Sequence, residues 1–450
     1  MVKPSPETLK RSLKPIHLWA IAVGLVISGE YFGWNYGWGV AGTIGFLIAT
    51  LIVTVMYITF VFSYTELTTS IPHAGGAFAY AYRALGPFGG LVAGYATLID
   101  FLLATPAIAF ALGSYLHFLY PSIPVLQSAL FFNVVFILIN ISGIKESATF
   151  SVFITLLAVA ELLLFMGIIS PHFKLVNYLK DPMPFGWKGI FAALPYAVWF
   201  YLAIEGVAMV AEEVKEPSKN IPKGYISGLA TLTILALGVM ILTGGLTDWH
   251  TLSNLDYPLP EAIAVALGRA NGLTKLFASI GLFGLIASFH GTILASSRQV
   301  FAMARGGYLP HSLSKINHRF KTPHWAIIAT GFVSFAALFT GTTSQVIVLS
   351  VLGAVVMYIM SMVSLFVLRS KEPQLNRPFI APFYPVFPAV ALVLSVVCLI
   401  AIVYYNAMLS FIFFIGLVIA ALLFVLTGKH KIMNDMLLSK TNAIMEHENL

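Results

Sequence analysis

Three long stretches of the chain contain no Asp, Glu, Lys or Arg: residues 101–144, 322–368 and 378–428. An α-helix rises 1.5 Å per residue, so about 20 apolar residues cross the roughly 30 Å hydrocarbon core of a bilayer. Each stretch therefore has room for two crossings. Backbone polar groups find no water partner in lipid, so the crossings are predicted to be helices. The chain is expected to be an all-α polytopic membrane protein.

The rest of the sequence continues this pattern. Of 450 residues, 59% are hydrophobic and 10% are charged, against about 25% charged in an average soluble domain. Connecting segments are too short for a separate extramembrane domain. The sequence predicts twelve transmembrane helices, at residues 16–42, 43–67, 88–117, 125–143, 147–169, 189–213, 224–246, 272–303, 325–341, 343–368, 386–405 and 407–427.

The basic residues predict the orientation of the chain. If the N-terminus is cytoplasmic, all but five of the 25 Lys and Arg fall on cytoplasmic segments. The positive-inside rule then places both termini in the cytoplasm and the protein in the cell membrane. Because this topology explains the basic excess, the lipid bilayer is an expected partner and nucleic acid is not. The single cysteine, Cys398, excludes an intrachain disulfide, and no cofactor or metal site is expected.

Two predicted spans are interrupted near their middle. In the first, Ser28-Gly29-Glu30 ends an apolar run and Tyr31 follows. In the sixth, an Ala-Ile-Glu-Gly segment at residues 203–206 follows Trp199 and Tyr201. Corresponding interruptions in two halves of a chain point to a transporter site at the bilayer midplane. With a polar histidine of the eighth span, the candidate substrate-binding residues are Ser28, Gly29, Glu30, Tyr31, Trp199, Tyr201, Ala203, Ile204, Glu205 and His290.

Four acidic residues lie well inside predicted spans: Glu30, Asp100, Glu161 and Glu205. A charged side chain at the bilayer midplane costs about 2.5–3.5 kcal/mol on insertion scales, so each needs a reason. No Lys or Arg lies equally deep, and the spare negative charge suits a cationic substrate or a coupled proton. Candidate coupling or gating residues are Glu205, Asp100 and Glu161, although Asp100 can equally anchor a neighbouring helix and Glu161 can lie near the outer end of its span.

Three ordered segments resemble the amino acid–polyamine–organocation (APC) superfamily: residues 64–87, the loop at 211–224 and the end of the eighth span at 297–310. The resemblance implies two inverted five-helix repeats, at 16–169 and 189–368, and two peripheral helices at 386–427. It leaves cytoplasmic segments at 1–15 and 428–450. It also implies secondary transport by alternating access, with gating or proton sensing at Glu205.

Glu30 departs from the glycine-rich break that binds the substrate carboxylate in amino acid carriers of this superfamily. A second carboxylate nearby costs several kcal/mol in a low-dielectric site, so an amine without a carboxylate is expected. The segment around Glu30 resembles the ethanolamine permease branch, and ethanolamine or a similar small amine is the predicted substrate. An amino acid or polyamine carrier on the same fold remains an alternative, and a nutrient sensor that binds without transporting is a weaker one.

Each candidate residue also has a plainer interpretation. Glu30 can cap the second half of the first span, since carboxylates are favoured at helix N-termini. Trp199 and Tyr201 can pack against neighbours rather than bind an ammonium by cation–π contact. His290 can be a hydrogen-bonded core histidine. No catalytic constellation or phosphate-binding loop is visible in the sequence, so the chain is predicted to be a transporter rather than an enzyme.

Overall fold

The computed structural model describes residues 11–143 and 148–429, and these residues form helices and loops without a β-strand. Most of the predicted cytoplasmic segments 1–15 and 428–450 lies outside the described residues. The elements are α1 Pro15–Val26, α2 Ser28–Tyr31, α3 Tyr36–Ser70, α4 Ala77–Leu119, α5 Val125–Ile141, α6 Ala148–Ile169, η1 Ser170–His172, α7 Leu175–Tyr178, α8 Gly186–Trp199, η2 Ile204–Glu213, α9 Pro217–Leu246, η3 Trp249–Thr251, α10 Pro258–Leu267, α11 Gly272–Arg305, η4 His311–Ser314, α12 His324–Thr340, α13 Thr343–Lys371, α14 Val386–Tyr405 and α15 Ala407–Leu426.

Nine helical segments of the described chain are long and apolar enough to cross a membrane. They are Tyr36–Ser70, Ala77–Leu119, Thr149–His172, Gly186–Glu213, Pro217–Leu246, Gly272–Arg305, Thr343–Lys371, Val386–Tyr405 and Ala407–Leu426. The other three predicted spans coincide with the shorter helices α1, α5 and α12. The all-helical membrane architecture is therefore confirmed, while twelve crossings and the inverted repeat stay predictions.

Several predicted boundaries differ from the structure. The third span was predicted to begin at residue 88, but α4 begins at Ala77 and passes through a non-helical glycine, Gly86, with φ 76°. Helix α9 begins at Pro217 instead of residue 224, because proline is well suited to the first turn of a helix. The predicted boundary between residues 42 and 43 falls at non-helical Gly42 within α3. Beyond it, the amides of Ile44 and Gly45 donate to the carbonyl oxygen of Pro182 at 2.9 and 3.1 Å.

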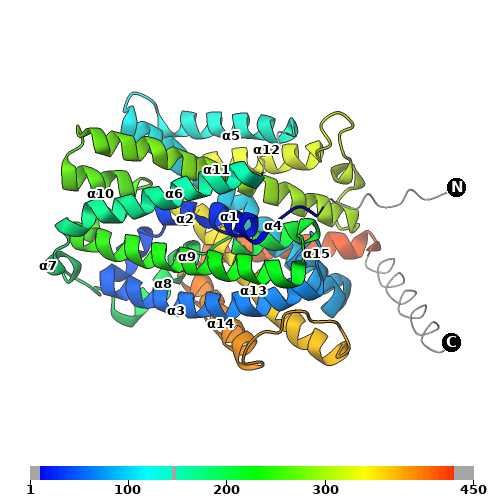
Figure 1. The fold of residues 1–450 in the computed structure, drawn as a ribbon. Helices are drawn as coiled ribbons and strands as arrows, with labels where there is room; N and C mark the ends of the chain where they lie inside the picture. The colour runs from blue at the N-terminus through cyan, green and yellow to red at the C-terminus, as the bar shows by residue number, and fades with distance from the viewer. Residues whose placement is uncertain (1–10, 144–147, 430–450) are drawn as a thin grey trace, which may run out of the picture.

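The broken helices lie inside the bundle. In Figure 1, α5 and α12 lie side by side along one edge, α14 lies at the opposite edge, and α1 and α2 lie between them. Helices α4 and α13 approach each other closely at Gly353, where an added Cβ would come within 2.6 Å of the Ala96 carbonyl oxygen and 2.8 Å of the Asp100 amide nitrogen. Only glycine permits this approach, which places Asp100 against α13.

The segment before α1 is bonded to the end of η2. The amides of Ser12 and Leu13 donate to the Glu213 carbonyl oxygen at 2.8 and 3.1 Å, and the Lys215 amide donates to the Leu13 carbonyl oxygen at 3.0 Å. Leu13 and Val214 thereby form an isolated parallel β-bridge. The two interrupted helices are joined by backbone at this end.

A buried ion-pair cluster lies near the end of α3. Glu66, 1% exposed, accepts two hydrogen bonds from Arg369, each 2.7 Å long. Its carboxylate also lies 3.3 Å from the Arg377 guanidinium and accepts the Ala381 amide at 2.8 Å. One carboxylate thus joins α3, the end of α13 and the segment that leads to α14.

At the opposite ends of α3 and α13, the side chain of Asp256 links the two helices. Its carboxylate accepts hydrogen bonds from the Tyr36 hydroxyl, at the start of α3, and from Thr343, at the start of α13, where the distance is 2.9 Å. Burial raises the pKa of Asp256 above its ordinary value of 3.8. The folded protein therefore favours the protonated acid.

We expect the contribution of Asp256 to the stability of the folded protein to decrease as the pH rises. A raised folded-state pKa gives stability that is fully present below pH 3.8 and is lost as the pH passes through the folded-state pKa. An Asp256→Asn variant imitates the protonated acid, so the slope of its melting temperature between pH 4 and 8 should be flatter than that of the wild type. Equal slopes would contradict this role. The matched Asp248→Asn variant should leave the slope in this range unchanged, because hydrogen bonds from Lys180 and His250 lower the pKa of Asp248 below 3.8, so its carboxylate is ionised above that pH in both the folded and the unfolded protein.

Candidate functional site

The first interruption lies later in the chain than predicted. Residues 28–31 form the short helix α2, and the non-helical stretch is 32–35. Phe32 is fully extended, and Gly33 has φ 90°, a conformation that side chains disfavour. Asn35 stabilises the stretch, because its side-chain oxygen accepts the Gly33 amide at 3.0 Å and its amide group donates to two carbonyls of the loop before α10.

The second interruption lies at residues 200–203, between α8 and η2. Ala203 adopts a left-handed conformation with φ 77°, which costs roughly 1–2 kcal/mol for a residue with a Cβ. The following 3₁₀-helix, η2, has 10 residues, although such helices rarely exceed three or four. Ile204 and Glu205 therefore belong to the first turn of η2 rather than to the break. Strain of this kind concentrates at functional sites.

The two interruptions contact each other directly. A Cβ added at Gly29 would lie 3.3 Å from Phe200 Cα and closer still to the Trp199 carbonyl oxygen. The Trp199 indole donates to the Phe32 carbonyl oxygen at 2.9 Å, and the Trp34 indole donates to the Glu30 carbonyl oxygen at 3.0 Å. These bonds satisfy carbonyls that the broken helix leaves without intrahelical partners. Trp199 therefore has a structural role at the junction.

A cavity of about 10 Å³ lies between the two interruptions. A cavity of this size has room for about one water molecule. The residues that line it are Leu25 and Val26 from α1, Ser28 and Gly29 from α2, Ala104 and Ile108 from α4, Trp199 from α8, Leu202 and Ala203 from the second interruption, and Thr292 from α11.

Ser28 and Ser288 bring the first interruption against α11. Ser288 Oγ donates to the Leu25 carbonyl oxygen at 2.6 Å, which leaves Ser28 Oγ to donate to Ser288 at 2.8 Å. A hydroxyl carries one proton, so the direction of both bonds follows. Ser288 was not among the predicted site residues, since a lone serine in a long apolar helix carries no distinctive sequence signal.

Glu30 is buried without a hydrogen-bond donor. Its exposure is 0%, and neither carboxylate oxygen has a partner among the described residues. Its side chain does not cap α3, which begins at Tyr36 without a side-chain cap. A buried carboxyl group without a partner is costly, and capping of α3 does not account for it.

Asp100 and Glu205 form a pair of acids. Both are buried, and their side chains are near enough to share a hydrogen bond. No donor reaches Asp100 Oδ2 or Glu205 Oε1 among the described residues, so a hydrogen bond between the two acids would require one proton on the pair. Near the remaining oxygens, the Ser350 hydroxyl donates to the Asp100 main-chain carbonyl oxygen at 2.7 Å and lies 3.4 Å from Asp100 Oδ1. The Tyr358 hydroxyl donates to Glu205 Oε2 at 3.3 Å.

The hydroxyl network around Glu205 extends to α3. Tyr57 and Tyr358 are joined by a 2.7 Å hydrogen bond. The rings of Tyr57 and Tyr201 lie 4.8 Å apart, and the Tyr201 hydroxyl is bonded to Thr54 at 2.7 Å. Because Thr54 already donates to the Thr50 carbonyl oxygen, Tyr201 is the donor. Tyr57 and Tyr358 were not predicted as site residues, because aromatics in membrane helices usually serve packing.

The remaining two candidates lie away from the acid pair. Glu161 on α6 accepts a 2.7 Å hydrogen bond from the Tyr31 hydroxyl, so it contacts the first interruption rather than Asp100 or Glu205. His290 on α11 is bonded through Nδ1 to the Asn140 side-chain amide of α5 at 3.0 Å. Asn140 Nδ2 is a donor, so Nδ1 of His290 is the acceptor. This partner fits a hydrogen-bonded core histidine.

The geometry can be compared with known proteins. A family model described as amino acid permease matches residues 13–439. The chain belongs to this family. An uncharacterized transporter of Rhizobium meliloti (strain 1021) is 30% identical over 411 residues, with 87% of each chain covered. The prediction of an APC superfamily transporter is confirmed, and the permease is a multi-pass membrane protein.

Relatives of this permease carry different substrate names. The methylthioribose transporter of Bacillus subtilis (strain 168) is 29% identical, with 86% of this chain and 87% of the relative covered. The branched-chain amino acid permease of the same organism is 26% identical over the same shares. These names support a transporter of small metabolites and do not single out one substrate.

Proposed function

We propose that this permease carries a small amine without a carboxylate, with ethanolamine as the leading candidate, and that it works by alternating access. The observation that carries the proposal is Glu30, a fully buried carboxyl group with no donor among the described residues. An ammonium supplies both the charge and the N–H donors that this group lacks. A substrate carboxylate in the same place would be repelled.

The cavity supplies further polar groups for such a substrate. The hydroxyls of Ser28 and Thr292 are the polar side-chain groups along its apolar lining, beside the Trp199 indole. Glu30 does not line the cavity but directly follows Gly29, which does. In the proposal, the substrate ammonium therefore reaches Glu30 only when the site opens, and its hydroxyl lies toward Ser28 or Thr292. A volume of about 10 Å³ is too small for ethanolamine, so substrate binding requires the two interruptions to move apart. Rocking of one repeat against the other supplies this movement in transporters of this architecture.

We assign proton coupling to the Asp100–Glu205 pair. Two carboxyl groups in contact share a proton because both cannot be ionised at that distance. Glu205 lies in the first turn of η2, directly after the second interruption. Movement of that interruption would therefore change the surroundings of Glu205 and with them its protonation. Glu161 contacts Tyr31 instead, and it is not placed in this proton step.

Uptake into proteoliposomes tests the substrate. Purified permease should accumulate radiolabelled ethanolamine above protein-free vesicles, and an inward proton gradient should increase the initial rate. Unlabelled ethanolamine should compete at concentrations at least tenfold below those needed for alanine, arginine or putrescine. Equal competition by alanine would favour an amino acid carrier, in line with the family description, and would overturn the argument from Glu30. Binding without flux would indicate a sensor.

A further inference from the structure

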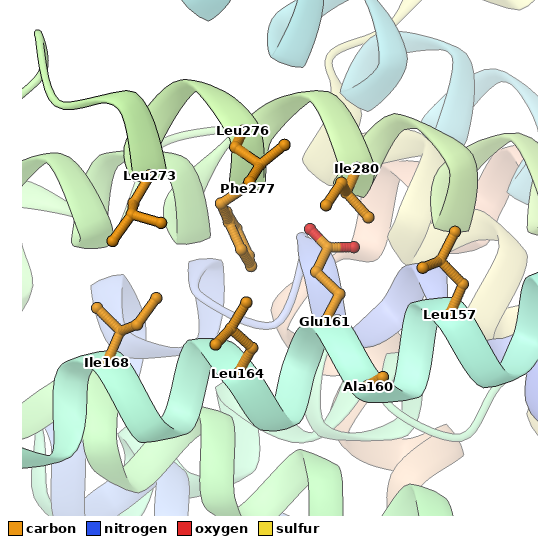
Figure 2. A pocket seen from close by; sticks show the side chains of 9 residues that line it. All are labelled: Leu157, Ala160, Glu161, Leu164, Ile168, Leu273, Leu276, Phe277 and Ile280. Atoms are coloured by element: carbon orange, nitrogen blue, oxygen red, sulfur yellow. The ribbon is translucent and has the colours of Figure 1, made fainter.

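A groove lies between α6 and α11, separate from the central cavity. It encloses about 160 Å³ and is lined by eight apolar residues and Glu161. Figure 2 shows the Glu161 carboxyl group pointing from α6 toward α11, near Phe277 and Ile280. The central cavity shares none of these residues. The groove is therefore a distinct feature of the molecule.

The groove faces the part of the surface that a bilayer would cover. Leu164 is 50% exposed, Leu273 48% and Leu276 52%, and all three belong to its lining. They lie on membrane-spanning segments, so lipid rather than water borders this opening. A ligand reaches the groove most directly from the hydrocarbon phase, and its body must be apolar.

Glu161 is the single polar residue in the lining of the groove. The residue is 3% exposed, and its Oε2 accepts the Tyr31 hydroxyl at 2.7 Å. Its Oε1 is buried and has no donor among the described residues. An unsatisfied buried acceptor costs about 1–3 kcal/mol, or more when charged. A ligand that donates an N–H to Oε1 would remove this penalty, and an ammonium would also neutralise the carboxylate.

We propose that this groove binds hydrophobic primary amines from the bilayer, with the ammonium on Glu161 Oε1 and the apolar body between α6 and α11. The volume sets the size of the ligand, since an engineered apolar cavity of about 150 Å³ accommodates benzene. Benzylamine, a phenyl group with one aminomethyl substituent, fits this combination. The inference does not depend on which substrate the central cavity carries.

Occupation of this site would affect the broken helix. Tyr31 belongs to α2, and its hydroxyl is bonded to the same carboxylate that the amine contacts. The Tyr115 hydroxyl in turn donates to the Tyr31 carbonyl oxygen at 3.2 Å. An amine at Glu161 therefore acts on α2 from the lipid side, and hydrophobic amines are a class of ligand that would regulate the permease without entering its transport path.

Direct binding of benzylamine tests the proposal without any transport measurement. Permease in lipid nanodiscs should bind radiolabelled benzylamine saturably in a scintillation proximity assay, and benzyl alcohol should displace it at least tenfold less well. Glu161→Gln should weaken binding at least tenfold. Ala160→Phe should abolish binding by filling the groove from an exposed lining position. Ala336→Phe, the same change at an exposed residue of α12, should leave binding unchanged.

A further variant separates the groove from the central cavity. Glu30→Gln should bind benzylamine as the wild type does, because Glu30 does not line the groove. Loss of binding in Glu30→Gln with retention in Glu161→Gln would place the amine in the central cavity and overturn the proposal. Unchanged binding in both Glu161→Gln and Ala160→Phe, or no saturable binding by the wild type, would also overturn it. Variants that elute as one symmetric peak in gel filtration exclude misfolding as the cause.

Discussion

Ethanolamine uptake by a Glu30→Gln variant is expected to fall at least tenfold at low substrate concentration. The substitution preserves the shape of the side chain and removes its charge. Hydrogen bonds to charged groups contribute about 1.5–3 kcal/mol, which corresponds to roughly 10–150-fold in affinity. The apparent KM from initial rates in proteoliposomes measures this loss. Selectivity over alanine should shrink at the same time, because the repulsion of a substrate carboxylate disappears.

Stability distinguishes a binding role for Glu30 from a structural one. The carboxylate oxygens have no donor among the described residues, so the glutamine substitution would break no hydrogen bond and the melting temperature should be unchanged or higher. Glu30→Asp, which keeps the charge one methylene farther back, should retain more affinity than Glu30→Gln. A stable Glu30→Gln variant with wild-type uptake would contradict the proposed substrate contact.

The second large effect is expected from Glu66→Gln. Glu66 is the only carboxylate in contact with Arg369 and Arg377 among the described ion pairs. Removal of one partner from a buried ion pair typically costs about 3–5 kcal/mol, because the other charge stays buried without compensation. For a protein of this size the melting temperature in detergent should fall by roughly 5–10 °C. Fluorescence-detected gel filtration after heating measures the change.

Glu372→Gln is the matched control. Glu372 pairs with Arg83 through a 2.6 Å contact, but the two side chains are 33% and 42% exposed. Exposed ion pairs contribute about 0–1 kcal/mol, so the melting temperature should change by at most about 2 °C. Similar losses in both variants would show that burial does not set the importance of the Glu66 cluster.

Hydropathy was sufficient to predict the helical membrane architecture. Charge-free runs such as residues 378–428 contain α14 and α15 in full, because the requirement for about 20 apolar residues is local in sequence. Helix α10 was missed. It has 10 residues and begins at Pro258, and a short helix outside the membrane leaves no comparable hydropathy signal.

The acids of the candidate site could be predicted, but their grouping could not. A midspan carboxylate is detectable because it is costly in lipid, and Glu30, Asp100, Glu161 and Glu205 are all buried. Which of them meet depends on helix rotation and on the close α4–α13 contact at Gly353. From the sequence alone, Asp100, Glu161 and Glu205 were therefore predicted together as coupling or gating residues.

The interruptions were found from glycine and acidic residues, although both were placed a few residues off. Ser28–Tyr31 form a helical turn, and the chain leaves the helix at the extended Phe32, followed by Gly33 with a positive φ. Ala203 adopts the left-handed conformation in the second interruption. This conformation cannot be predicted from the sequence, because alanine does not favour it. Tertiary contacts such as the Trp199–Phe32 hydrogen bond stabilise the second interruption.

The backbone bridge between Leu13 and Val214 has a mechanical consequence. It fastens the start of α1 to the end of η2, so a force applied to one half-helix is transmitted to the other through the main chain. Movement of α1 alone would break up to three backbone hydrogen bonds. We therefore expect α1 and η2 to move together as one rigid unit. Their side of the permease would then open in one step rather than in two.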